Sequence, residues 1–339
     1  MSIRMLNKAK IRQFFFGKRS VSQKRWQQRV PGIYVFNYHR IGDARFSEFD
    51  PNVFSCTAEQ FEQHLLFYKQ EFEVLDEAAL IALLDSGEAI TKPYALITFD
   101  DGYIDSYQHA FPLLTKHQLS AVFFVVTEYT NGGIFAWWDE VAWLVKHCQS
   151  NTLKLKHWSH AVDLSGKNQT QNIRKLLYAF KEDHSFSMEE KLDMLKAECK
   201  APPMPSSHSL FANWQQLKEM ADGGMTIGSH TRSHPILAHL SLEQQCEELT
   251  QSRDFIESKL GTAVSMLAYP VGRTDSFTEQ TQALAQECGY RLAFSFMNGI
   301  NTQLDAQSAY QLKRISVDGN KEVDSLKVQV MELNTKHRA

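Results

Sequence analysis

Short apolar stretches recur along the chain and are separated by segments that carry helix signals. Eight of these stretches are rich in β-branched or aromatic residues and have the length of buried strands: residues 33–38, 72–75, 94–99, 121–126, 225–228, 264–269, 292–296 and 313–317. Thr57, Ser187 and Ser241 each stand three residues before Gln or Glu, which is the spacing of a helix capping box. Gly261 and Gly289 mark two helix ends. This alternation predicts an α/β fold with a parallel sheet.

Residues with catalytic chemistry gather at the ends of the predicted strands. His39, Asp100, Asp101, His230 and Tyr269 all lie at or just past the C-terminal end of a strand. Barrels of the TIM type build their active sites on that face of the sheet. The pattern therefore places a candidate site there.

One strand, residues 94–99, ends on two adjacent carboxylates and a glycine, Asp100, Asp101 and Gly102. Neighbouring side chains at a strand end point in different directions, so one carboxylate can bind a metal while the other faces the space beside it. Two like charges this close are costly unless a cation or a shared proton separates their roles. The alternative is an ordinary strand followed by an Asp-Gly turn.

A second motif follows the predicted strand at residues 225–228. His230 and His234 are four residues apart and can close on one ion. Together with a carboxylate of the Asp-Asp pair they supply two imidazoles and one oxygen ligand. Such a set leaves metal positions open for water and substrate, as a hydrolytic site requires, and zinc is its default ion.

These residues carry a resemblance to a known family. Residues 98–102 (TFDDG) and 229–235 (SHTRSHP) resemble the first two motifs of the polysaccharide deacetylases, the NodB-homology proteins of carbohydrate esterase family 4. Residues 268–272 (AYPVG) are similar to a degenerate third motif, and the resemblance extends over roughly residues 31–318. It implies a distorted, incomplete (β/α) barrel.

The resemblance also implies a role for each matching residue. Asp101, His230 and His234 would be the metal ligands, and Asp100 the general base that takes a proton from metal-bound water. The main-chain N–H near Val271 would help to hold the oxyanion. The implied reaction is hydrolysis of an N-acetyl group from a sugar, or in some members of an O-acetyl or N-formyl group. Tyr269, in the third motif, is a further candidate substrate contact.

Two positions depart from the family pattern. The arginine that usually orients the base corresponds here to Ala268, and Arg273 is the candidate substitute. The late histidine that usually acts as general acid is absent from residues 312–315 (LKRI), which carry Arg314 instead. Arg314 is a candidate partner for the carboxylates or for an anionic substrate, and an ordinary ion pair is the alternative.

His39, within residues 35–42 (VFNYHRIG), is the candidate general acid. It follows the first strand, and some family members resemble this arrangement, with a Tyr-His there in place of the late histidine. General-acid chemistry suits a side chain that titrates near neutrality. The alternative is a histidine that only hydrogen-bonds the strand end.

Residues 128–212 form a predicted helical insertion, interpreted as a lid or specificity region. Trp138 and Asp139 are candidates for the substrate cleft, because aromatic faces bind sugar rings with little entropy to lose. The alternative is a hydrophobic anchor for a helix over residues 140–148, and this alternative is preferred for Trp137 and Trp143. Further helices are predicted near 169–182 and 188–199.

Composition limits the classes of partner and compartment. The net charge of −3 gives no large cationic surface for nucleic acid, and five scattered cysteines are typical of reduced thiols. Residues 1–30 form a basic leader without a signal-peptide core or membrane span. A solvated leader is slightly preferred, and the alternative is peripheral contact with an anionic membrane, which Phe14–Phe16 and the basic residues would suit. Residues 321–339 read as a C-terminal tail. We therefore expect a cytoplasmic or membrane-peripheral protein that acts on a lipid-linked or nucleotide-linked sugar.

The sequence thus predicts a metal-dependent hydrolase, most simply zinc-dependent, that deacetylates an amino sugar of a polysaccharide, oligosaccharide or glycan precursor. A deformylase or O-deacetylase acting on a lipid-linked sugar would use the same site. A catalytically degenerate carbohydrate-binding barrel is the hypothesis from another class, because the usual arginine and late histidine are missing. The sequence does not give the oligomeric state.

Overall fold

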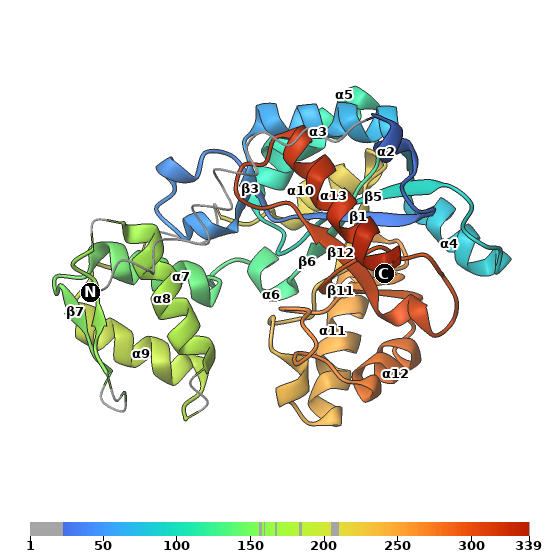
Figure 1. Cartoon of the computed structure of the whole chain (residues 1–339). Helices are drawn as coiled ribbons and strands as arrows, with labels where there is room; N and C mark the ends of the chain where they lie inside the picture. Colours follow the sequence, from blue (N-terminus) through green and yellow to red (C-terminus); the bar gives the residue numbers. More distant parts are fainter. Residues whose placement is uncertain are drawn as a thin grey trace.

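The computed structural model describes residues 23–155, 158, 160–166, 168–182, 185–204 and 210–338, and its centre is a parallel β-barrel (Figure 1). Its strands are β1 (Gly32–Tyr38), β4 (Glu73–Val74), β5 (Pro93–Phe99), β6 (Val122–Val125), β9 (Thr226–Ser229), β10 (Met266–Ala268), β11 (Leu292–Asn298) and β12 (Leu312–Ser316). The order β1-β12-β11-β10-β9-β6-β5 closes because β5 pairs back with β1, while β4 lies along the other side of β5. The predicted incomplete (β/α) barrel is confirmed, with seven closing strands where a TIM barrel has eight.

All eight predicted strands are present, each within two residues of its predicted ends. Alternate residues of each strand face the barrel interior and the surrounding helices. In β1, Ile33 and Val35 join an interior cluster with Leu96 and Phe294, whereas Phe36 stacks on Tyr68 of a covering helix at 4.3 Å. Because both faces are covered, these strands read as nearly continuous apolar runs.

Helices cover the outside of the barrel (Figure 1): α3 (Ala58–Glu71), α5 (Phe111–His117), α10 (Trp214–Asp222), α11 (Leu242–Leu260), α12 (Glu279–Glu287) and α13 (Val323–Arg338). Leu80 of α4 (Glu77–Ser86) joins the interior cluster. The predicted capping boxes at Thr57, Ser187 and Ser241 are confirmed, and Gly261 caps α11 in the left-handed conformation.

The insertion forms a helical layer beside the barrel (Figure 1, green). It contains α6 (Thr127–Thr130), α7 (Trp137–His147), α8 (Gln169–Glu182), α9 (Met188–Cys199) and a hairpin of β7 (Thr152–Leu153) and β8 (Val162–Asp163). Leu176 and Leu195 belong to a hydrophobic core of its own. The helix predicted over residues 140–148 begins three residues earlier, at Trp137.

The described parts of both chain ends pack against the barrel. The last part of the basic leader packs on the barrel: α2 (Gln23–Gln27) buries Trp26, whose indole N–H donates to Glu71 at 2.6 Å. Phe14–Phe16 and the rest of residues 1–22 lie outside the described residues. Within the predicted C-terminal tail, α13 buries Leu326 and Val330 in the main core. Within the described ranges, no helix combines the length and hydrophobicity needed to cross a membrane.

Candidate active site

The polar residues predicted at strand ends line one cavity. His39 follows β1, Asp100 and Asp101 follow β5, and His230 follows β9, so all of them reach the carboxyl face of the barrel. The cavity there has a volume of about 330 Å³, and residues of α7 and α8 form part of its wall. The insertion therefore completes a site whose chemistry comes from the barrel.

Three side chains form a candidate metal centre. Asp101 Oδ1 lies 3.6 Å from Nε2 of His230 and 3.6 Å from Nε2 of His234. The three ligand atoms all lie within 4.8 Å of one another, and no described acid, histidine or cysteine elsewhere forms such a group. One carboxylate oxygen and two imidazole nitrogens are the donor set of hydrolytic zinc sites, so the residues present fit a divalent ion.

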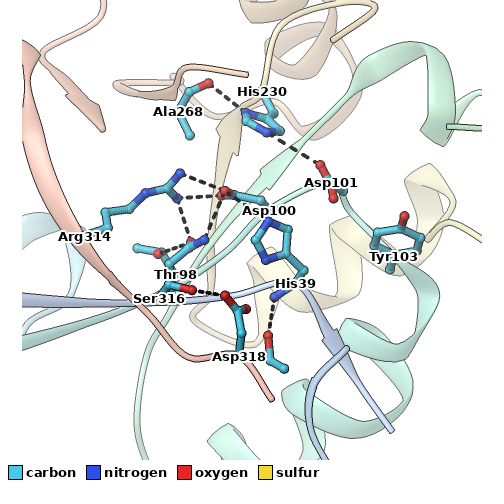
Figure 2. Close-up of polar contacts among 12 residues, drawn as sticks. His39, Thr98, Asp100, Asp101, Tyr103, His230, Ala268, Arg314, Ser316 and Asp318 are labelled. Carbon is cyan, nitrogen blue, oxygen red and sulfur yellow. Dashed lines mark hydrogen bonds and ion pairs between the residues drawn. The ribbon is translucent and has the colours of Figure 1, made fainter. Parts of the chain in front are cut away.

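The protonation of this centre also suits a cation. The Ala268 carbonyl accepts a hydrogen bond from His230 Nδ1–H at 2.8 Å, which fixes the tautomer and leaves Nε2 free to coordinate (Figure 2). Burial lowers the pKa of His230 to about 4 and that of His234 well below its usual value. Burial raises the pKa of Asp101 to about 7. Burial therefore disfavours the ionised form of Asp101. A bound divalent cation would offset this effect by stabilising the carboxylate.

Left-handed backbone conformations aim these ligands. Asp101, Thr231, His234 and Val271 have φ values of 73°, 68°, 63° and 62°, a region that residues other than glycine rarely adopt. Such strained positions persist where surrounding structure holds them, and they gather at functional sites. At Asp101 the turn sends two adjacent carboxylates to different partners, Asp100 toward Arg314 and Asp101 toward His230 (Figure 2).

Asp100 is held by a buried hydrogen-bond network. Arg314 Nη1 and Nη2 donate to its two oxygens at 2.7 and 2.8 Å, and Asn37 Nδ2 donates to Oδ2 at 3.2 Å. Asn37 Oδ1 in turn accepts from Arg314 at 2.7 Å and from Thr98 Oγ1 at 2.8 Å. Burial alone would raise the pKa of Asp100, but the charge and hydrogen bonds of Arg314, together with the charges of His230 and His39, outweigh it and keep that pKa well below its usual range. The carboxylate is therefore ionised and fixed in orientation.

The predicted substitution of the missing arginine by Arg273 is wrong. The Arg273 side chain is 63% exposed at the rim of the cavity and pairs with Asp275 at 3.2 Å. Arg314 instead fills the space, from β12, where the family pattern has its late histidine. The strand register explains this, because β12 pairs with β1, β1 pairs with β5, and Arg314 therefore projects toward the end of β5.

His39 lies beside Asp100 on the cavity wall. Its Nε2 is 4.0 Å from Asp100 Oδ2, its side chain is 22% exposed, and its ring meets Phe296 edge-on at 5.9 Å. The main-chain N–H of His39 donates to Ser55 Oγ at 3.0 Å, which fixes the backbone after β1. The imidazole thus reaches both the buried carboxylate and the cavity, so the structure brings it to the predicted site.

Of the two candidate residues in the third motif, Val271 has a free hydrogen-bond donor and Tyr269 does not. Val271 lines the cavity, and no described residue accepts a hydrogen bond from its main-chain N–H. Tyr269 uses both of its donors elsewhere: its N–H donates to Phe294 O at 3.0 Å and its hydroxyl to Tyr310 O at 3.0 Å. Its ring stacks on Phe277, so Tyr269 lines the cavity but has no free hydrogen-bond donor for the substrate.

The tryptophans and acid that open α7 have different surroundings. Trp138 lines the cavity, meets His234 at 4.8 Å and donates from Nε1 to the Tyr103 hydroxyl at 2.7 Å. Tyr103 donates onward to Asp139 at 2.7 Å, and burial raises the pKa of Asp139 to about 6. Asp139 is fully buried and is absent from the cavity wall, so it braces Trp138 through Tyr103. Trp137, interpreted from sequence as an anchor, also lines the cavity.

Two groups of residues at the site are not predicted from the sequence. Asn37 carries a detectable signal, since it is the one amide within the apolar strand at residues 33–38. Arg174 and Lys181 of α8 line the cavity as well, together with Leu177 and Tyr178. These α8 residues follow an ordinary amphipathic pattern, and only the docking of the insertion shows which face they present.

Comparison with known proteins agrees with this site. The model of the polysaccharide deacetylase family matches residues 88–182 and 189–293. The Bacillus subtilis (strain 168) protein YxkH, whose name assigns it provisionally to the polysaccharide deacetylases, is 22% identical over 288 residues, which is 84% of this chain and 70% of YxkH.

Solved structures share the fold. The Streptococcus pyogenes deacetylase PplD, in complex with acetate, has a TM-score of 0.57 at 20% identity over 90% of this chain and 99% of PplD. The de-N-acetylase from Aggregatibacter actinomycetemcomitans has a TM-score of 0.56 at 15% identity, covering 88% of this chain and 99% of its own. The family match spans more than half of the chain. The chain therefore belongs to the polysaccharide deacetylase family and is a carbohydrate deacetylase.

Proposed function

We propose that this deacetylase is a metal-dependent hydrolase that removes the N-acetyl group from an amino sugar, with Asp100 as general base. The observation that carries the proposal is one cavity in which an ionised, arginine-held carboxylate lies next to an Asp-His-His ligand group. The acetate complex of the related PplD holds the carboxylate product that this reaction would release.

Asp101, His230 and His234 would hold the ion, for which zinc is our proposal. When bound, a divalent ion at this place polarises an acyl carbonyl and makes a water molecule more acidic. Asp100 takes the proton of the attacking water, and Arg314 keeps Asp100 both ionised and oriented for this task. The N–H of Val271 donates to the oxyanion that develops on the acyl carbonyl.

His39 supplies the proton that the departing amine needs. Its ring lies on the cavity wall beside Asp100, so it can reach a substrate nitrogen without displacing the base. This position also weakens the case for a non-catalytic sugar-binding barrel, which rests on the missing family arginine and histidine. Arg314 contacts the base and His39 lies next to it, so both departures have a local replacement.

Acetate release from a short N-acetylglucosamine oligomer tests the proposal. We expect the chelator-stripped protein to lose activity and zinc to restore it, because the base and acid alone do not polarise the acyl carbonyl. Zinc should also raise the melting temperature, since a ligand present at a hundred times its Kd stabilises the native state by about 2.7 kcal/mol. Zinc binding without turnover of any acylated sugar would favour the binding barrel, and no zinc binding would refute the metal site.

Replacing His39 with Ala should lower kcat for acetate release by roughly 10²-fold or more, because general acid catalysis contributes about 10²–10⁴. Zinc affinity should be unchanged, since the Asp101, His230 and His234 ligands stay in place. The matched control is His109→Ala, an exposed histidine that lines neither the active-site cavity nor the larger cavity beside it, which should keep full activity. A His39→Ala rate within threefold of the parent protein would remove His39 from the mechanism.

A further inference from the structure

A second, larger cavity opens from the active site. It has a volume of about 1160 Å³ and lies between the helical insertion and the loops that follow β9 and β10. Trp137, Lys181, His234 and Val271 line both this cavity and the active-site cavity. The two spaces therefore adjoin at the candidate metal centre, and a substrate that enters one can extend into the other.

The walls of the second cavity are largely apolar. Ile134, Phe135 and Met188 line it from the insertion, and Ile236 and Leu240 line it from the barrel side. Ile134 is 46% exposed, although the removal of an apolar side chain from water is energetically favourable. Glu128, Glu140, Glu189, Lys191 and Lys196 also line the cavity, but most of its exposed wall is apolar. An exposed apolar wall of this kind marks a place for a ligand or partner.

Two basic side chains, Arg174 and Lys181, lie near the junction of the two cavities. Arg174, Leu177, Tyr178 and Lys181 lie on one face of α8, at the spacing that brings helix side chains into line, and all four line the active-site cavity. The charge of Asp50, on the same cavity wall, acts on both Arg174 and Lys181, but among the described residues neither cation makes a direct ion pair with it.

Arg273 reaches the same space from the loop after β10. Burial lowers the pKa of Lys181, and the charge of Arg273 lowers it further, so the two cations repel each other across the cavity. An anion between them would relieve this repulsion and would be held by charge-assisted hydrogen bonds.

We propose that the substrate is an acylated amino sugar joined through a phosphate to an aliphatic chain. This inference rests on the deacetylase function proposed above and names its substrate class. The sugar lies at the metal centre, the phosphate contacts Arg174, Lys181 and Arg273, and the chain occupies the apolar cavity. A neutral glycan chain would instead offer these cations no anionic group and would set its hydroxyls against an apolar wall.

Binding of farnesyl phosphate, below its micellar concentration, to the zinc-loaded full chain tests the phosphate and chain contacts without turnover. Isothermal titration should show that Lys181→Gln and Ile134→Asp each weaken binding about tenfold, equivalent to one lost charge contact or apolar contact. Two matched controls lie outside both cavities: Lys175→Gln on the same helix, and Leu242→Asp, whose side chain is also 46% exposed. These should bind like the parent chain. No binding, or equal loss in variants and controls, would overturn the inference.

Acetate release from three N-acetylglucosamine probes separates this inference from the general function. The probes carry at the anomeric carbon a hydroxyl, a uridine diphosphate, or a farnesyl phosphate. We expect kcat/KM to rise at least tenfold with the farnesyl phosphate relative to both others, and Lys181→Gln to lose most of that gain. Equal rates on the nucleotide probe would overturn the aliphatic chain, and faster release from an N-acetylglucosamine pentamer would overturn the whole substrate class. Failure of every probe, with farnesyl phosphate bound as expected, would refute the deacetylation and leave the binding site standing.

Discussion

Asp100→Asn should lower the rate of acetate release by about 10²–10⁴-fold, the contribution that a positioned general base makes. The amide has nearly the shape of the carboxylate, so Asn37 and Arg314 keep a partner, but it cannot take a proton from water. Zinc affinity should persist, because Asp101, His230 and His234 are unchanged. The measurement is kcat at saturating substrate, alongside zinc titration of the same preparation.

The matched control for this variant is Asp254→Asn. Asp254 is also paired with an arginine, Arg253, at 2.8 Å, but its side chain is 58% exposed and lies outside the active-site cavity. The control should retain full activity. An Asp100→Asn rate within tenfold of the parent protein would mean that another group takes the proton and that the assigned mechanism is wrong.

Strand positions follow from sequence because burial on both faces of a barrel leaves a strong local signal. Apart from Thr98, the run at residues 94–99 is apolar whichever face each residue takes, and the same holds for residues 33–38 apart from Asn37. Capping boxes are equally local, since Thr57 and Gln60 satisfy each other's backbone within one turn. Parallel strands bring their ends to one face, so the sequence also places Asp100, Asp101 and His230 together.

Contacts between distant segments are what the sequence does not reveal. Arg314 lies 214 residues from Asp100, and only the pairing of β12 with β1, and of β1 with β5, brings its guanidinium to the base. Arg273 is nearer in sequence to the third motif, but it points to the rim. The prediction of Arg273 as the partner of Asp100 was based on its proximity to the third motif in the sequence, and it is wrong for this reason.

The sequence-based predictions for the C-terminal segment and for the insertion fall short for a related reason. Helix α13 has weak amphipathicity, and its buried Leu326 and Val330 become core residues only because the barrel offers them a surface. The face of α8 that carries Arg174 and Lys181 is likewise a polar helix surface until the insertion packs beside the active site. Tertiary packing, which no local pattern encodes, decides both cases.

Arg314→Met should destabilise the protein by ~3–5 kcal/mol, the cost of leaving a buried charge without its partner. Asp100 and Arg314 are 2% and 1% exposed, so water cannot take over the role of the guanidinium. The measurement is the free energy of unfolding in urea near neutral pH. Arg291→Met is the matched control: its pair with Asp85 is 42% and 57% exposed, and we expect its removal to cost less than about 1 kcal/mol.

The pH dependence distinguishes this role of Arg314 from simple structural support. Arg314 is the strongest of the influences that lower the pKa of Asp100, so the parent enzyme keeps an ionised base even in acid. In Arg314→Met, burial acts without that charge and raises the pKa of Asp100, so the acidic limb of kcat against pH should move to higher pH. The contribution of Asp100 to the free energy of unfolding should also be lost toward acid pH. Asp100 stabilises the parent fold above the pKa it has in the unfolded chain, and this contribution disappears as pH falls through the lowered folded-state pKa. Arg314→Lys, which keeps the charge but not the two-pronged contact, should give an intermediate limb. If all three proteins shared one acidic limb, Arg314 would hold the fold together without tuning the base.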